Sequence, residues 1–483
     1  MKKFVFLLLI LMLFASACAP QADSPVLKRS MNLQPCPLKV GQDNQVQALC
    51  GTLPVPENPN DPQGRTISLN VVVLPAVKRI PEPDALFLLA GGPGQAATEA
   101  FPALLAAFFT IHQTRDIVMV DQRGTGKSNP LRCLDDEDES LAEDAALEKL
   151  KACPAALDAD LRYYTTEIAM ADLDAVRAAL GYETINLYGA SYGTRAALTY
   201  LRLYPDRVRS LILDAVVDPS FILLLDSAHD GQAALDQFFA RCQADAACRE
   251  AFPSLRSDFD TLLVRLEKEP VELSIRHPIT AQPLDLTLTR SLLLDLVFSI
   301  LYSPDLSATL PLTLRTAYQE GNYAPLVSLA YMLDVGLYDG MFYAVTCTED
   351  APLIQPEEAA RRSAGTLFGD RTAQFLSVCA DWPRGQVSAD FRAPIRSDVP
   401  VLIFSGEADP ITPPRHAERL LEGLPNSLHL VFDESGHGNI ANRCSAGIVE
   451  AFVKSASIEG LDVACVPGVR PAPFFTNFNG PRP

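Results

Sequence analysis

The strongest constraint on the fold is the sequence Gly-Ala-Ser-Tyr-Gly at residues 189–193, taken together with its flanks. Residues 184–188 predict a strand just before it, and residues 194–204 predict a helix just after it. A sharp turn from strand to helix needs small flanking residues, and it holds the central side chain clear of the sheet. Ser191 is therefore the predicted nucleophile. The structural alternative is a glycine-rich helix start that Ser191 caps.

Short apolar runs punctuated by glycine recur along the chain and alternate with helical patterns. Such runs are typical of strands buried on both faces of a parallel sheet. Residues 166–180 place apolar side chains on one face of a helix, which Gly181 ends. Besides 184–188, the predicted strands are 66–74, 85–90, 116–120, 209–214, 399–404 and 427–432, and a last helix covers 443–455.

The alternation is interrupted once by a mostly helical stretch, which contains one possible strand pair near 271–289. The simplest account is an α/β fold with a mostly parallel central sheet and an inserted helical cap domain. We expect the first part of the core at 36–220, the cap at 221–395, and the second part of the core with a C-terminal extension at 396–483.

The N-terminus predicts export. Two lysines, a short apolar run and small residues make residues 1–17 a signal peptide, and 18–35 are expected to form a tether. Residues 15–18 resemble the lipobox of bacterial lipoproteins, which makes Cys18 the expected lipidation site, although Ala15 stands where leucine is usual. Cleavage that leaves an ordinary N-terminal Cys18 is the alternative. The expected location is the cell surface as a lipoprotein, otherwise secreted or periplasmic, with membrane contact only through this anchor.

Charge and cysteines narrow the classes of function. A net charge of -19 opposes binding to nucleic acid. Neither Cys-x-x-Cys nor His-Glu-x-x-His occurs, so we expect no metal site and no cofactor. Of 11 cysteines, ten remain after Cys18, which suits disulfides in an oxidising compartment; buried free thiols are the alternative. Connectivity does not follow from sequence, and chain neighbours suggest Cys36 with Cys50, Cys133 with Cys153, Cys242 with Cys248, Cys347 with Cys379, and Cys444 with Cys465.

A serine nucleophile needs a base, and in this kind of fold the order along the chain is Ser, acid, His. His437 lies in a predicted loop at 434–438, just past a strand, where an imidazole can reach Ser191. His416 falls in a predicted helix and His429 inside a predicted strand. His437 is therefore the predicted general base.

The base needs a carboxylate that fixes its tautomer. Asp409 lies in the loop at 406–410, at the carboxyl end of a predicted strand, where catalytic groups collect in open α/β sheets. Asp409 is the predicted acid. Glu407 and Asp218 are the alternatives, Glu407 as a solvated side chain and Asp218 as a turn residue.

Acyl transfer places negative charge on an oxygen, which two backbone N–H groups should stabilise. Tyr192, directly after the nucleophile, is the first predicted donor. The second should come from Gly-Gly-Pro-Gly at 91–94. Since Pro93 has no N–H, Gly92 is the predicted donor and Gly94 the reserve. An ordinary Gly-Pro turn is the structural alternative.

Together these segments resemble the prolyl and tripeptidyl aminopeptidase family of α/β-hydrolases. The likeness spans roughly 85–219 and 396–455, and Ala90 stands where members often have histidine. Asp121 and Arg123 are expected to shape their loop rather than react. The matching motifs are Gly-Gly-Pro-Gly at 91–94, Asp-Gln-Arg-Gly-Thr-Gly-Lys-Ser at 121–128, Gly-Ala-Ser-Tyr-Gly-Thr-Arg at 189–195, Gly-Glu-Ala-Asp-Pro at 406–410 and Gly-His-Gly at 436–438.

Residues 346–350 and 379–382 make the tripeptidyl branch the closer likeness. The resemblance implies hydrolysis of short peptides or amino-acyl amides from a free N-terminus. It also implies that cap carboxylates pair with the substrate ammonium, and Glu349 is the expected substrate-binding residue. A solvated loop acid beside a disulfide is the alternative for Glu349. An esterase or similar small-molecule hydrolase with the same three residues is the second hypothesis for function, and a non-catalytic binding protein is the third.

Overall fold

The computed structural model describes residues 29–41, 44–135, 138, 141–333, 336–369 and 371–481. The predicted signal peptide and Cys18 lie outside the described residues. None of the helices in the described part of the chain is long and apolar enough to cross a membrane.

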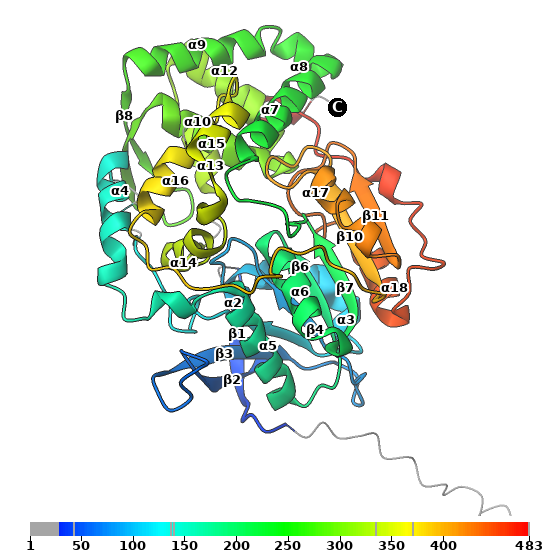
Figure 1. Ribbon diagram of the computed structural model, residues 1–483. Coiled ribbons are helices and arrows are strands. Elements are labelled where there is room, and N and C mark those ends of the chain that lie inside the picture. The colour runs from blue at the N-terminus through cyan, green and yellow to red at the C-terminus, as the bar shows by residue number, and fades with distance from the viewer. Residues whose placement is uncertain are drawn as a thin grey trace, which may run out of the picture.

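One nine-stranded sheet forms the core of the lower half of the molecule as drawn in Figure 1. Its first three strands and β5 pair antiparallel, and the pairs from β5 to β11 are parallel. This confirms the mostly parallel sheet, and the predicted strands agree with the observed ones to within two residues. In spatial order the strands are β1 (Gln34–Val40), β2 (Asn44–Pro56), β3 (Thr66–Leu74), β5 (Ile117–Val120), β4 (Leu86–Leu89), β6 (Ile185–Ala190), β7 (Val208–Asp214), β10 (Val401–Gly406) and β11 (Ser427–Phe432).

Helices cover both faces of the sheet, because alternate strand residues bury their side chains in two separate clusters. Phe87 and Leu89 pack on the side of α5 (Thr166–Leu180), α6 (Tyr192–Leu203) and α17 (Pro414–Glu418). Leu86 and Leu88 pack on the other side, with α2 (Ala97–Ala100), α3 (Phe109–His112) and α18 (Arg443–Ser455). The remaining helix before β6 is α4 (Glu143–Ala152), and short 3-10 turns occupy Pro102–Phe108, Cys153–Ala155, Leu161–Tyr163, Pro205–Arg207, Ala351–Leu353, Leu421–Gly423 and Val466–Gly468.

The chain between β7 and β10 is mostly helical and lies over one end of the sheet (Figure 1). Most of it shares a hydrophobic cluster of its own, separate from the two beside the sheet. Its elements are α7 (Ser227–Ala244), α8 (Ala246–Ala251), α9 (Leu255–Lys268), the hairpin β8 (Val271–Arg276) and β9 (Pro283–Leu288), α10 (Arg290–Leu301), α11 (Pro304–Ser307), α12 (Leu310–Glu320), α13 (Ala324–Tyr331), α14 (Asp339–Glu349), α15 (Pro356–Ser363) and α16 (Arg371–Cys379).

Three details differ from the expected domain organisation. The expected tether already packs from Arg29, which pairs with Asp116 at 2.8 Å, and β1 begins before residue 36. Helix α14 buries its apolar face, including Met341, in the cluster of the α/β core rather than in that of the cap. The C-terminal extension returns to the cap, where Phe474 is buried and the hairpin β12 (Phe475–Asn477) and β13 (Gly480–Pro481) begins. Periodicity does not show which of two apolar surfaces a segment contacts.

Five disulfides link the cysteines that are neighbours along the chain. They are Cys36–Cys50, Cys133–Cys153, Cys242–Cys248, Cys347–Cys379 and Cys444–Cys465, which are the pairs suggested by the sequence.

Candidate active site

Ser191 lies at a strained turn between β6 and α6. Its backbone has φ 55° and ψ -125°, a conformation rarely adopted by a residue with a side chain. A Cβ on Gly189 would collide with the carbonyl of Gly193, and a Cβ on Gly193 would collide with the carbonyl of Leu89. Only glycine therefore fits on both sides of the serine, which explains the spacing of the motif.

His437 and Asp409 are in direct contact at the ends of two neighbouring strands. Asp409 follows β10, His437 follows β11, and the distance from His437 Nδ1 to Asp409 Oδ2 is 2.8 Å. The buried carboxylate also accepts hydrogen bonds from the N–H groups of Ile411 and Thr412, both at 2.9 Å, and from the Thr412 hydroxyl at 2.7 Å. A carboxylate with this many donors holds its position and orients the imidazole.

The pKa values of this pair move apart. Burial raises the pKa of Asp409, but the charge and hydrogen bond of His437 and the loop amides outweigh burial, so the pKa lies below its ordinary value. Burial lowers the pKa of His437, yet the charge and hydrogen bond of Asp409, with a contribution from Asp214, raise it above the ordinary value. The pair therefore favours the ion pair that forms when the imidazole takes up a proton.

Two further residues hold the loop that carries His437. The backbone N–H of His437 donates to the carbonyl of Tyr302 at 2.9 Å, and the two rings meet edge to face with centroids 4.9 Å apart. The buried carboxylate of Asp214, at the end of β7, accepts the N–H groups of Asn439 and Ile440. Sequence reasoning missed Tyr302, Asp214 and Thr412. The sequence signal for Asp214 is that it ends a predicted strand, and the signal for Thr412 is that it lies close to the predicted acid. Nothing in the sequence indicates a role for Tyr302.

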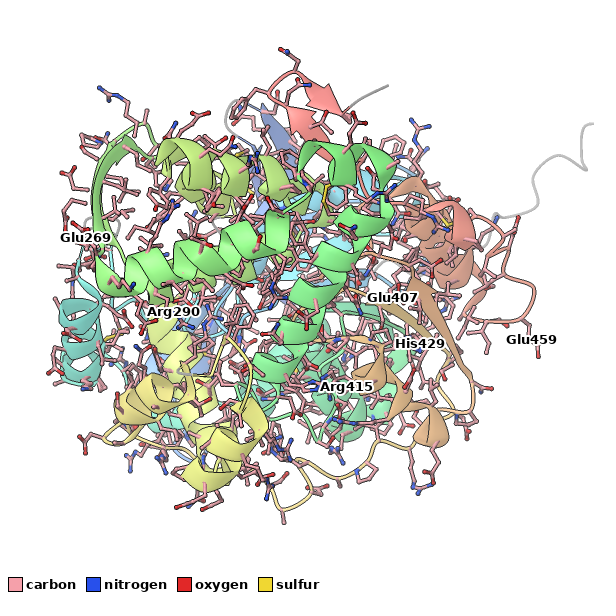
Figure 2. All side chains as sticks on the ribbon, turned by 90° about the horizontal axis from the view of Figure 1, so that it is seen from above. Glu269, Arg290, Glu407, Arg415, His429 and Glu459 are labelled. Atoms are coloured by element: carbon pink, nitrogen blue, oxygen red, sulfur yellow. A yellow bond between two sulfur atoms is a disulfide. The ribbon has the colours of Figure 1, made fainter. Side chains whose placement is uncertain are left out.

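The alternative acids and bases have other partners. Glu407, labelled in Figure 2, is exposed and accepts the N–H of Glu434 at 3.1 Å. Asp218 contacts Ser220, His416 and Arg419. His429, on β11, faces the Ser405 hydroxyl at 3.0 Å. The structure thus brings Asp409, and not Glu407 or Asp218, to His437.

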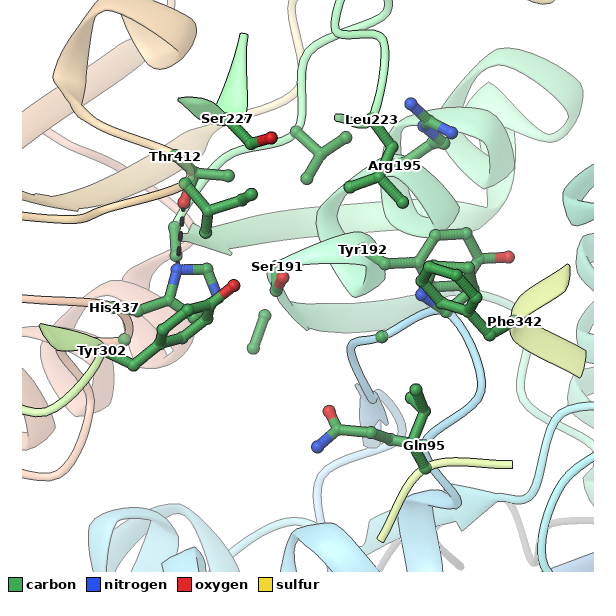
Figure 3. Close-up of a pocket in the computed structure, with 18 of the residues that line it drawn as sticks. Gln95, Ser191, Tyr192, Arg195, Leu223, Ser227, Tyr302, Phe342, Thr412 and His437 are labelled. Atoms are coloured by element: carbon green, nitrogen blue, oxygen red, sulfur yellow. Dashed lines mark hydrogen bonds between the residues drawn. The ribbon is translucent and has the colours of Figure 1, made fainter. Parts of the chain in front are cut away.

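Ser191 and His437 line one cavity of about 690 Å³ beneath the cap. Figure 3 shows Ser191 between His437 and Tyr302 on one side and Tyr192 and Phe342 on the other. Among the described residues, the hydrogen-bond partners of the His437 side chain are Asp409 and Thr412 and do not include Ser191. The contact of His437 with Ser191 during the reaction is therefore part of our proposal. The cavity wall is largely apolar, and its charged side chains are Arg195, Asp350 and Arg371.

Both predicted oxyanion donors border this cavity. Tyr192 is the first residue of α6, so its N–H has no partner within the helix. Gly92 also lines the cavity, with a φ of 104° that glycine adopts readily. Gly94 instead packs against the backbone of Tyr338, whose N–H donates to its carbonyl at 2.8 Å. The position of Gly92 supports its choice over Gly94.

Glu349, at the end of α14, has partners that the sequence did not suggest. Its side chain is buried, and its two carboxylate oxygens accept the N–H and the hydroxyl of Thr166 at 2.7 and 2.9 Å. The neighbouring Asp350, rather than Glu349, lines the cavity, where it pairs with Arg195 at 2.8 Å. The role of Glu349 in binding a substrate ammonium stays a prediction, and its solvated alternative is wrong because the side chain is buried.

The described part of the chain contains no cluster of metal-ligating side chains. No group of three or more His, Cys, Asp or Glu side chains is arranged there to hold an ion.

Comparison with known proteins matches two family models to this chain, one described as the alpha/beta hydrolase fold at residues 84–248 and one as TAP-like protein at residues 365–465. Serine protease Hip1 of Mycobacterium tuberculosis is 29% identical over 81% of this chain and 81% of its own length. The tripeptidyl aminopeptidase of Streptomyces coelicolor is 28% identical over 88% of this chain and 84% of its own. Among solved structures, proline iminopeptidase of Mycobacterium smegmatis has a TM-score of 0.40 and 18% identity over 84% of this chain and 98% of its own. The two family models, the curated relatives and the nucleophile turn together show an α/β-hydrolase, and the match to the TAP-like protein model and to these relatives makes the chain similar to the tripeptidyl aminopeptidase-like branch.

Proposed function

We propose that this protein is a serine peptidase that cleaves short peptides or amino-acyl amides from a free N-terminus through an acyl-enzyme. The observation that supports the proposal is a single cavity lined by the strained Ser191, the carboxylate-bound His437 and the two residues, Gly92 and Tyr192, to which we assign the oxyanion-binding N–H groups. The names of the curated relatives, a serine protease and a tripeptidyl aminopeptidase, support a peptide substrate.

In the first half of the proposed reaction, Ser191 Oγ attacks the carbonyl carbon while Nε2 of His437 accepts the hydroxyl proton. Asp409 stabilises the imidazolium that forms. The negative charge that develops on the carbonyl oxygen is held by the N–H groups of Gly92 and Tyr192. When the C–N bond breaks, His437 gives its proton to the leaving amine, which leaves an ester on Ser191.

In the second half, water attacks this ester and loses a proton to His437. The tetrahedral intermediate collapses, the bond to Ser191 Oγ breaks, and the proton returns to the serine. The largely apolar cavity lowers the local dielectric constant, which strengthens each of these electrostatic contacts.

The cap favours short substrates, because its helices lie over one end of the sheet (Figure 1) and the volume of the cavity that Ser191 lines is in the range of small-molecule sites. The five disulfides suit an oxidising compartment, which supports export. Lipid attachment at Cys18 is part of the same proposal and rests on the sequence alone.

The test compares three substrates: a peptidyl anilide with a free amine, its N-acetylated form and a simple ester. The Ser191→Ala variant serves as the blank for each. We expect the free-amine anilide to have the highest kcat/KM. Equal rates with and without the acetyl group, together with fast ester hydrolysis, would favour the esterase alternative.

A further inference from the structure

A chain of hydrogen bonds leads from Glu349 to Tyr192, whose N–H is a proposed oxyanion donor. Glu349 Oε2 accepts the Thr166 hydroxyl at 2.9 Å, and Thr166 Oγ1 lies 2.8 Å from the phenol oxygen of Tyr192. The amide of Gln122 donates to the same phenol oxygen at 3.0 Å. The three residues of the chain are nearly or fully buried, so water does not compete for these contacts.

These contacts fix both ends of Tyr192. Its backbone forms the first residue of α6 beside the strained Ser191, and its side chain is held at the phenol oxygen by Thr166 and Gln122. In Figure 3 the ring of Tyr192 extends away from Ser191. The carbonyl of the peptide unit between Ser191 and Tyr192 accepts the N–H and the hydroxyl of Thr194 at 2.8 and 2.7 Å. The anchored ring adds to this by holding the Cα of Tyr192, from which the N–H direction is set, so a shift of this Cα would have to break the phenol contacts.

Glu349 is poorly placed to bind a substrate. Thr166 engages both of its carboxylate oxygens, and the residues that line the cavity include Asp350 but not Glu349. Arg195 is 3.6 Å from Glu349 Oε2 but 2.8 Å from Asp350. A cationic amine in the cavity would meet Asp350 and Arg195 before it reached Glu349.

We propose that Glu349 is a positioning residue, which acts through Thr166 to fix Tyr192 and thereby the oxyanion-binding N–H. The inference rests on the proposed acyl-transfer function and assigns Glu349 a different task from ammonium binding. Burial raises the pKa of Glu349 to about 7, against the lowering effects of Arg195 and Thr166. In the protonated state the direction of the chain reverses: Oε2–H donates to Thr166 Oγ1, which then donates to the phenol oxygen. Both contacts persist, but the phenol O–H loses Thr166 as its acceptor.

This chemistry gives matched variants. Thr166→Val keeps the volume but removes the hydroxyl, whereas Thr166→Ser keeps the hydroxyl. Glu349→Gln keeps an acceptor for the Thr166 N–H, and its Nε2–H donates to Thr166 Oγ1. Thermal unfolding of each variant shows whether it is folded before its kinetics are compared.

The experiment measures kcat and KM for the free-amine anilide, its N-acetylated form and the ester. We expect Thr166→Val to lower kcat about tenfold or more on all three substrates, bounded by the roughly 10²- to 10³-fold loss of a whole oxyanion donor. KM and the preference for the free amine should stay within about twofold, as expected for an interaction that acts only in the transition state. Thr166→Ser and Glu349→Gln should keep kcat within about threefold of the wild type.

The competing role gives the opposite pattern. If Glu349 binds the ammonium, Glu349→Gln would raise KM for the free-amine substrate alone and abolish the preference, and Thr166→Val would have little effect. Either result overturns the positioning role. Failure of the proposed function is separate, since it would appear as turnover that survives Ser191→Ala.

Discussion

The carboxylate of Asp214 accepts the backbone N–H of Asn439 at 2.9 and 2.8 Å from its two oxygens, across 225 residues of chain. It therefore ties the end of β7 to the loop that carries His437. The Ile440 N–H and the Tyr188 hydroxyl donate to the same group, so each of these three partners among the described residues is a donor to Asp214.

Replacement of Asp214 by Asn should loosen this loop, because the new amide NH₂ would face donors and find no acceptor. We expect the free energy of unfolding to fall by about 1–3 kcal/mol, and kcat to fall with it. Urea unfolding and steady-state kinetics measure the two effects. Asp285, exposed on β9, is the matched control, and Asp285→Asn should change neither. If Asp214→Asn had the same free energy of unfolding and the same kcat as the wild type, the loop would not depend on this contact.

The pH profile tests the pairing of His437 with Asp409. The base works only when neutral, so kcat/KM should rise as pH increases through the pKa of His437. Because Asp409 raises that pKa, the acid limb should lie above the ordinary value of 6.5. In Asp409→Asn the limb should move to lower pH, and kcat should fall by a factor on the order of 10⁴ as the tautomer is lost. If the acid limb of Asp409→Asn lay at the same pH as that of the wild type, a group other than His437 would control it.

We expect the hydroxyl of Thr412 to support turnover. Its Oγ1 donates to Asp409 Oδ2 at 2.7 Å and lies 3.2 Å from His437 Nδ1. A hydrogen bond to a charged group contributes about 1.5–3 kcal/mol, so Thr412→Val should lower kcat about 10- to 100-fold, whereas Thr412→Ser should keep most of it. If kcat of Thr412→Val were within twofold of the wild type, the Thr412 hydroxyl would not contribute to catalysis.

Local features of this fold were predictable from sequence because their causes are local. The collision that excludes a side chain at Gly189 or Gly193 involves only the turn and the adjoining strand, so the motif indicates the turn directly. Strands buried on both faces leave apolar runs, which placed β6 and β10 to within two residues. The loops after β10 and β11 then identified Asp409 and His437, because parallel strands place their carboxyl ends at the same edge.

Long-range partners were not predictable, since nothing near Glu349 in the sequence indicates that Thr166, 183 residues away, engages its carboxylate. The same holds for Asp214, which a sequence pattern shows only as the last residue of a strand. Helix α14 is apolar enough to pack on either cluster, and the choice depends on the shape of the core surface. Only the three-dimensional structure shows these contacts, which in our proposal hold the reacting groups in place.

The most direct test of the central claim is the site of covalent labelling by a fluorophosphonate, determined by mass spectrometry of the intact protein and its peptides. Ser191, activated by His437, should carry a single adduct in the wild type. Ser191→Ala should carry none and should lose turnover, and His437→Ala should label far more slowly. An adduct on another residue, or undiminished turnover in Ser191→Ala, would contradict the assignment of Ser191 as the nucleophile.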